Sequence, residues 1–150
     1  MKEKLALIAI MLWMVTAFVF GFFFVRGWTS ESADHRTAVH LAPAERDLVL
    51  GEMRQMLLSV HSLVTGLSAG DRKIMEQAAR ASGMGMAADV DPVIMAKLPL
   101  TFKQQGMSVH RDFDALADSI ANGADQSTLL RNFTGITARC VGCHTAYRLP

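Results

Sequence analysis

The sequence predicts an all-α protein, in which an antiparallel four-helix bundle follows one transmembrane helix. Three observations support this fold class. An apolar run without a charge covers residues 5–25, and from residue 42 onward apolar side chains recur at alternating spacings of three and four. No useful length of the segment 42–150 alternates with the period of two that is typical of strands. That segment is long enough to form one helical core.

Residues 5–25 are expected to cross a membrane. About 21 residues at a rise of about 1.5 Å each span about 30 Å, the thickness of a bilayer's hydrocarbon core. Two lysines within residues 1–4 favour a cytoplasmic N-terminus. A cleaved signal peptide is the alternative, because Ser30 and Ser32 could form a late cleavage site. Its apolar region would normally be shorter, about 7–15 residues, so an uncleaved anchor is favoured.

The segment 26–41 is polar, rich in small residues and aperiodic, which predicts a flexible tether between the anchor and the helical domain. The first helix of the domain is expected to begin at about residue 42, with a proline in its first turn. Two overlapping apolar rows give this helix a wide core-facing stripe, whose centre line holds Met53, Val60 and Leu67. Glycines near residue 70 end the helix.

Three further helices are expected, over about 71–82, about 98–122 and from about 127 onward. Asp71 is a plausible N-cap for the second helix, and Asn122-Gly123 ends the third. A loop and a single helical turn fill the interval between the second helix and the third. The apolar face of the last helix aligns Leu129, Phe133, Ile136, Cys140, Cys143 and Tyr147.

Composition excludes several classes of function. The formal net charge is only +1, so there is no broad basic surface for nucleic acid. No nucleophile–base pair and no pair of acids stands out near the cysteines, so an enzyme is not expected. The chain has 2 cysteines, and both belong to one C-terminal motif. They therefore indicate a chemical role for this motif, and no cysteine is left for a disulfide scaffold.

That motif is Cys140-Val141-Gly142-Cys143-His144. Two thiols at this spacing can each add across one vinyl group of a haem, and the adjacent imidazole can then bind the iron. A zinc site would need four ligands, and a thioredoxin-like redox pair would need a βαβ context. A disulfide across two residues would close too short a loop to stabilise much. The motif predicts one covalently attached haem c, with His144 as an axial ligand.

The C-terminal run from Phe133 through this motif to Tyr147 and Arg148 resembles the class II cytochromes c, namely cytochrome c′ and cytochrome c556. In that family the motif lies at the end of a four-helix domain and is followed by an aromatic residue and an arginine. The resemblance covers about 42–148 and excludes the membrane segment. It implies export, because c-type haem is attached outside the bacterial cytoplasm. We therefore expect a single-pass protein of the bacterial inner membrane with its haem domain in the periplasm.

The resemblance also raises the question of a sixth iron ligand. A methionine on the first helix gives a six-coordinate haem in this family, whereas an apolar side chain there leaves the iron five-coordinate. Met53 and Met56 are the candidates, although methionine on a helical stripe is more often a core residue. If the first and last helices are antiparallel, Met53 lies at the better height opposite His144. Met53 is therefore favoured, and Met56 or an open site remain alternatives.

Family members commonly carry an arginine one turn before the ligand position, where this chain has Val49. Three arginines are candidates for contacts with the haem propionates: Arg46, Arg139 and Arg148. The other histidines are weaker candidates for iron. His61 lies at the flank of the stripe, His110 is expected to be exposed or at a rim, and His35 and His40 belong to the tether.

The expected function is electron transfer on the periplasmic side by a membrane-anchored monohaem cytochrome with a His/Met-ligated, low-spin haem. A five-coordinate protein that binds NO or CO is one alternative, and a haem accessory subunit of a larger membrane redox complex is another. The expected partners are membrane lipid and redox proteins of a respiratory or photosynthetic chain. A homodimer stays open, and no nucleic acid is expected.

Overall fold

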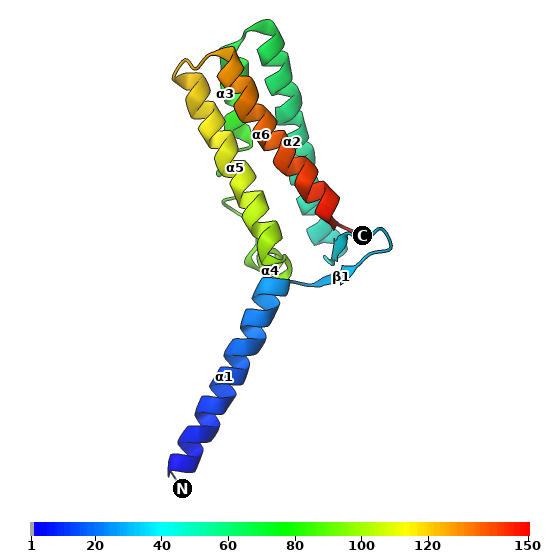
Figure 1. Cartoon of the computed structure of the whole chain (residues 1–150), viewed down its shortest axis with the longest axis vertical. Coiled ribbons are helices and arrows are strands. Elements are labelled where there is room, and N and C mark those ends of the chain that lie inside the picture. The colour runs from blue at the N-terminus through cyan, green and yellow to red at the C-terminus, as the bar shows by residue number, and fades with distance from the viewer. Residues whose placement is uncertain (1) are drawn as a thin grey trace.

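The computed structural model describes residues 2–150, and the prediction of a mostly helical chain is confirmed. The described residues form six helices and three short strands. The helices are α1 (Lys2–Arg26), α2 (Pro43–Ala69), α3 (Arg72–Ala81), α4 (Pro92–Lys97), α5 (Leu100–Ala121) and α6 (Gln126–Ala146). The strands are β1 (Thr29–Glu31), β2 (Thr37–Val39) and β3 (Tyr147–Arg148). In Figure 1, α1 projects as a single rod from a body made by the other elements.

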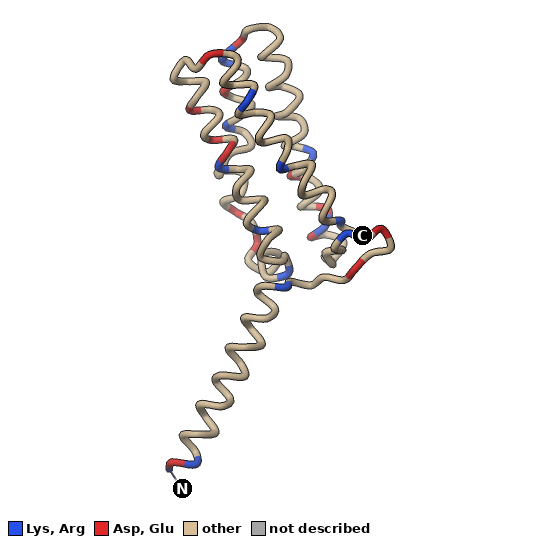
Figure 2. The backbone as a smooth tube through the Cα atoms, in the orientation of Figure 1, with Lys and Arg blue, Asp and Glu red and all other residues tan. Residues whose placement is uncertain are grey.

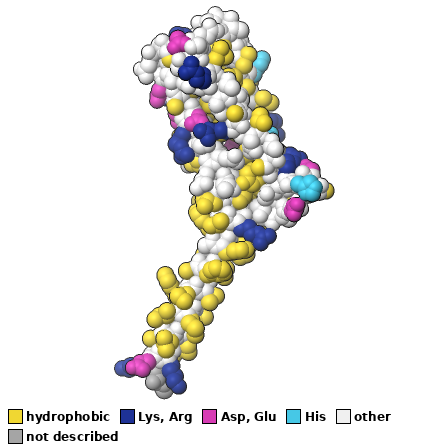
Figure 3. All heavy atoms as spheres, viewed as in Figure 1, with side chains coloured by type: hydrophobic (Ala, Val, Ile, Leu, Met, Phe, Trp, Pro, Cys, Tyr) yellow, Lys and Arg dark blue, Asp and Glu magenta, His cyan; other side chains and the backbone are white. Residues whose placement is uncertain are grey.

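Helix α1 is long and apolar enough to span a membrane. Its charged residues lie only at its two ends (Figure 2), and none of its side chains is buried. The space-filling view shows hydrophobic side chains along the whole rod (Figure 3). Such a helix, apolar all round and with protein contacts only near its C-terminal end, is suited to a lipid environment.

The ends of the remaining helices follow local capping chemistry. The backbone N–H of Ala42 donates to the Glu45 carboxylate at 2.8 Å, and Pro43 occupies the first turn of α2. Gly70 ends α2 in the left-handed conformation, with φ of +69°. Asp71 and Asp125 cap α3 and α6 by accepting backbone N–H groups of the first turn. The helix bounds therefore lie close to those that the sequence predicts.

Helix α2 packs on α3, α3 on α5, and α5 on α6. Two hydrophobic clusters result. The main cluster fills the end of the body far from α1, and its buried members are Leu63, Met75, Ala78, Ala79, Val109, Phe113, Leu116, Ala117, Ile120, Leu129 and Ile136. The second cluster lies nearer to α1 and consists of Val39, Ile94, Leu98 and Phe102. Met53 and Cys143 pack against this second cluster.

Residues 26–41 do not form the flexible tether that the sequence predicts. β1 pairs with β2 in antiparallel fashion, and β2 pairs in parallel with β3, which directly follows α6. In this register Thr37 lies opposite Tyr147, and both Ala38 and Val39 are buried. A strand of three residues is too short to show alternation, and its partner lies at the far end of the chain. We call the segment 28–40 the hairpin.

The end of α1 is docked on α4 and α5. Lys103 of α5 donates from Nζ to the carbonyl of Phe24 at 3.0 Å, and its Nζ lies 3.9 Å from the centroid of the Phe24 ring. The N–H of Trp28 donates to the carbonyl of Lys97 at 2.7 Å. Gly27 makes the turn with φ of +65°, and a side chain there would collide with the backbone of residues 97–99. The end of α1 is thus bound to α4 and α5 by these contacts.

Candidate functional site

Two adjoining hollows lie between α2, α5 and α6, at the end of the body where the chain terminates. Their volumes are about 250 Å³ and about 120 Å³. Met53, Phe102, Cys143 and His144 line both hollows. Taken together, the two volumes fall at the lower end of the range of small-molecule and cofactor sites, about 300–1,000 Å³. Residues of three helices that are far apart in the sequence are therefore brought to one cavity.

Both cysteines belong to this cavity. Cys140 and Cys143 are free thiols on successive turns of α6, and each is partly buried. Residues three apart share one helix face, so both thiols line the second hollow. Burial raises the pKa of each thiol above its usual value, which keeps both protonated at neutral pH. Among the described residues, no group of three or more His, Cys, Asp or Glu side chains is placed to hold a bare metal ion.

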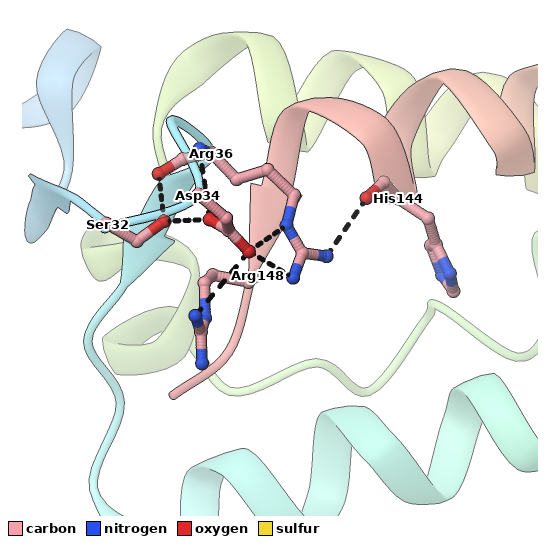
Figure 4. A network of polar contacts seen from close by, with 5 residues as sticks. All are labelled: Ser32, Asp34, Arg36, His144 and Arg148. Carbon is pink, nitrogen blue, oxygen red and sulfur yellow. Dashed lines mark hydrogen bonds and ion pairs between the residues drawn. The ribbon is translucent and has the colours of Figure 1, made fainter.

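His144 lies in the last turn of α6 and has an exposed side chain. Its backbone carbonyl accepts a hydrogen bond from Nη1 of Arg36 at 3.2 Å. The imidazole points away from Arg36 (Figure 4), and it lines both hollows. The structure therefore leaves the ring of His144 available to a ligand in the cavity.

The two methionine candidates have different surroundings. Met53 lines both hollows and packs against the second cluster, together with Cys143. Met56 lines only the second hollow and packs against the main cluster. A thioether from α2 and an imidazole from α6 thus line one cavity. Met53 lines both hollows together with His144, whereas Met56 lines only one of them.

The three arginines predicted from the sequence are distributed unevenly. Arg148 lines the first hollow, and its Nη1 lies 3.6 Å from the Asp34 carboxylate. Arg139 lines the second hollow and donates from Nε to Asp112 at 2.5 Å. Arg46 lines neither hollow, and its buried Nε has no hydrogen-bond partner among the described residues. Two of the three candidates are therefore at the cavity.

The prediction that His110 is exposed or at a rim is wrong. Its side chain is 7% exposed, it lines the second hollow, and its Nδ1 donates to the carbonyl of Ser82 at 2.8 Å. A carbonyl can only accept, so Nδ1 carries the proton. The signal in the sequence was its position three residues before the buried Phe113. His35, His40 and His61 are exposed and line neither hollow.

Two further residues at the cavity escaped the sequence analysis. Glu52 lines the second hollow, and burial raises the pKa of its carboxyl. Arg36 lines the first hollow, although it belongs to the hairpin and not to a helix. Glu52 could have been found from its place next to Met53 on the predicted helix. No local pattern pointed to Arg36, because only strand pairing brings it to the cavity.

No family model, curated protein or solved structure matches the chain. The chemistry of the cavity alone therefore defines the class of site. It combines two free thiols, an imidazole and a thioether with apolar walls and three arginines.

Proposed function

We propose that this chain is a membrane-anchored monohaem c-type cytochrome of the class II kind, which transfers electrons on the periplasmic side of the bacterial inner membrane. One observation carries the proposal: Cys140, Cys143 and His144 stand at the spacing of haem attachment and share a cavity with Met53 of a distant helix. In this proposal α2, α3, α5 and α6 form the four-helix bundle of the family, and α1 is an uncleaved anchor.

The cavity fits a haem in three respects. Its two thiols are free and line the same hollow, as attachment to the two vinyl groups of one haem requires. Gly106 of α5 lines the second hollow, and a Cβ added there would meet nothing within 4 Å, so this wall is open. Arg36 and Arg148 place positive charge at the first hollow, where acidic groups of a cofactor could bind.

A bound haem supplies one-electron chemistry, and the residues of the chain position it and adjust its potential. Cys140 and Cys143 would hold it to α6 by thioether bonds. His144 and Met53 would bind its iron, and a ligand pair that stays the same in both oxidation states would keep the rearrangement on electron transfer small. The thioether of Met53 would raise the reduction potential. Phe102, which is buried and lines both hollows, supplies an apolar wall to the site.

A haem accessory subunit of a larger membrane redox complex is the second candidate, and one observation favours it. Lys103 and Gly27 fix the end of α1 to the helical domain, so the domain cannot swing freely between separate partners. A fixed orientation suits a subunit that passes electrons to one neighbour. Both candidates use the same haem site and the same ligands.

Covalent haem is tested by mass spectrometry of the mature protein after extraction with acid acetone. One haem should remain attached to the peptide that contains Cys140 and Cys143. Loss of that mass would refute the proposal. An optical spectrum then separates the functions, because a low-spin spectrum that is insensitive to CO supports electron transfer. A high-spin spectrum with rapid CO binding would instead favour a gas-binding protein.

A further inference from the structure

We propose that Arg36 of the hairpin binds a carboxylate of the haem, which makes the segment between the anchor and the helical domain a part of the cofactor site. This inference rests on the proposed function, since it assumes a haem in the cavity. It assigns a role to a segment that would otherwise be only a connection.

The position of Arg36 is the first argument. Its side chain lines the first hollow together with His144 and Arg148 (Figure 4). Nε and Nη2 of Arg36 donate to Asp34 at 2.9 Å and 2.7 Å, and Nη1 donates to the carbonyl of His144 at 3.2 Å. A guanidinium has five N–H donors, so two of them remain for a ligand. The fork of an arginine matches a carboxylate in geometry.

The charge balance of the first hollow is the second argument. Among the described residues, its lining includes two arginines and no acidic residue. Asp34 stands behind them and contacts both Arg36 and Arg148. Hydrogen bonds from Arg36 and Ser32 hold the pKa of Asp34 well below its usual range, so this carboxylate is ionised. One negative charge shared by two guanidiniums leaves an excess of one positive charge, which an anionic group in the hollow would neutralise.

The construction of the hairpin is the third argument. The turn between β1 and β2 is closed by the N–H of Arg36, which donates to Asp34 at 3.2 Å, and by Ser32, whose hydroxyl donates to the carbonyl of Arg36 at 2.7 Å. Thr37, the next residue, pairs with Tyr147 just beyond α6. The guanidinium is therefore held at the cavity before a ligand arrives. Such pre-organisation lowers the entropic cost of binding.

A purely structural role of Arg36 is the competing explanation. In that case the guanidinium only caps the end of α6 through the His144 carbonyl and holds Asp34 in the turn. The two explanations predict different changes in the reduction potential when Asp34 is replaced. Removing Asp34 would loosen the hairpin in either case, but it would free Arg36 for the haem only if a haem carboxylate lies in reach.

The test uses the full-length, haem-loaded protein in detergent, with Arg36→Gln, Arg36→Lys and Asp34→Asn. Arg111→Gln, at an exposed position of α5, controls for the loss of one surface charge. Resonance Raman spectroscopy reports the bending modes of the haem propionates, and a redox titration reports the midpoint potential. Arg36→Gln should shift a propionate mode and lower the potential, because loss of a positive charge disfavours the added electron. Arg36→Lys keeps the positive charge but not the fork of N–H donors. Its midpoint potential should therefore lie closer to the wild-type value than its propionate bending mode does.

Asp34→Asn should raise the potential, because it removes a competing negative charge. Arg111→Gln should leave the propionate modes unchanged. If Arg36→Gln leaves these modes unchanged in a protein that carries its haem, the inference is overturned and the proposed function stands. Potentials that move in the same direction in Arg36→Gln and Asp34→Asn would also overturn it, in favour of the structural role. A wild-type protein without covalent haem would overturn both proposals.

Discussion

Replacing Met53 by alanine tests whether the protein is an electron carrier or a gas-binding protein. If Met53 is the sixth ligand, Met53→Ala leaves an open position on the iron. The haem should then bind CO, lose the weak charge-transfer band that a Met/His ferric haem shows at the red end of its spectrum, and have a lower reduction potential. Met56→Ala is the matched control, because Met56 is one helical turn away and packs against the main cluster.

The structure also sets the expected cost in stability. Truncation of a fully buried methionine to alanine costs about 2–5 kcal/mol. Met53 and Met56 are only partly buried, so we expect each variant without haem to lose on the order of 1–2 kcal/mol. Denaturant unfolding of the haem-free proteins should therefore give similar losses. Only the spectrum of the haem-loaded protein should distinguish the two variants.

Two outcomes would contradict this reasoning. If Met56→Ala alone removes the charge-transfer band, then Met56 is the ligand and the assignment is wrong by one turn, although the function stands. If the wild-type protein is already high-spin and binds CO rapidly, no methionine ligates the iron. The electron-transfer proposal then gives way to gas binding.

Three further predictions concern the cavity and the stability of the body. Gly106→Trp should fill the second hollow and abolish haem loading, whereas Gly135→Trp on α6, outside both hollows, should load haem normally. The ratio of haem to protein, measured by absorbance, tests this prediction. His110→Ala leaves a buried carbonyl without its donor and should cost about 1–3 kcal/mol in denaturant unfolding, against almost nothing for the exposed His61→Ala. Glu45 has its pKa lowered from 4.5 by the ammonium of a lysine in α4. Its carboxylate therefore stabilises the fold above pH 4.5, and this contribution is lost as the pH falls through the lower folded-state pKa. The melting temperature of Glu45→Gln should therefore be below that of the wild type at neutral pH, and the two should converge in acid.

The sequence by itself determined the features that depend on neighbouring residues. The apolar run of α1, the three-and-four spacing within α2 and α5, and the caps at Asp71 and Gly70 are local signals, because a helix satisfies its own backbone hydrogen bonds. The proposed haem-attachment motif is local as well, since both thiols and the imidazole lie within two turns of α6. These patterns predicted a mostly helical chain and the residues of α6 at the cavity.

Only the tertiary structure decided how the remaining parts meet. The hairpin pairs β2 with β3 at the opposite end of the chain, which replaces the predicted tether by a fixed connection and brings Arg36 to the cavity. Met53 packs against the second cluster and Met56 against the main cluster. His110 is buried and hydrogen-bonded to Ser82, the residue that follows α3. A three-residue strand carries no periodic signal, and burial depends on contacts between distant segments. Neither can therefore be read from the residues on either side.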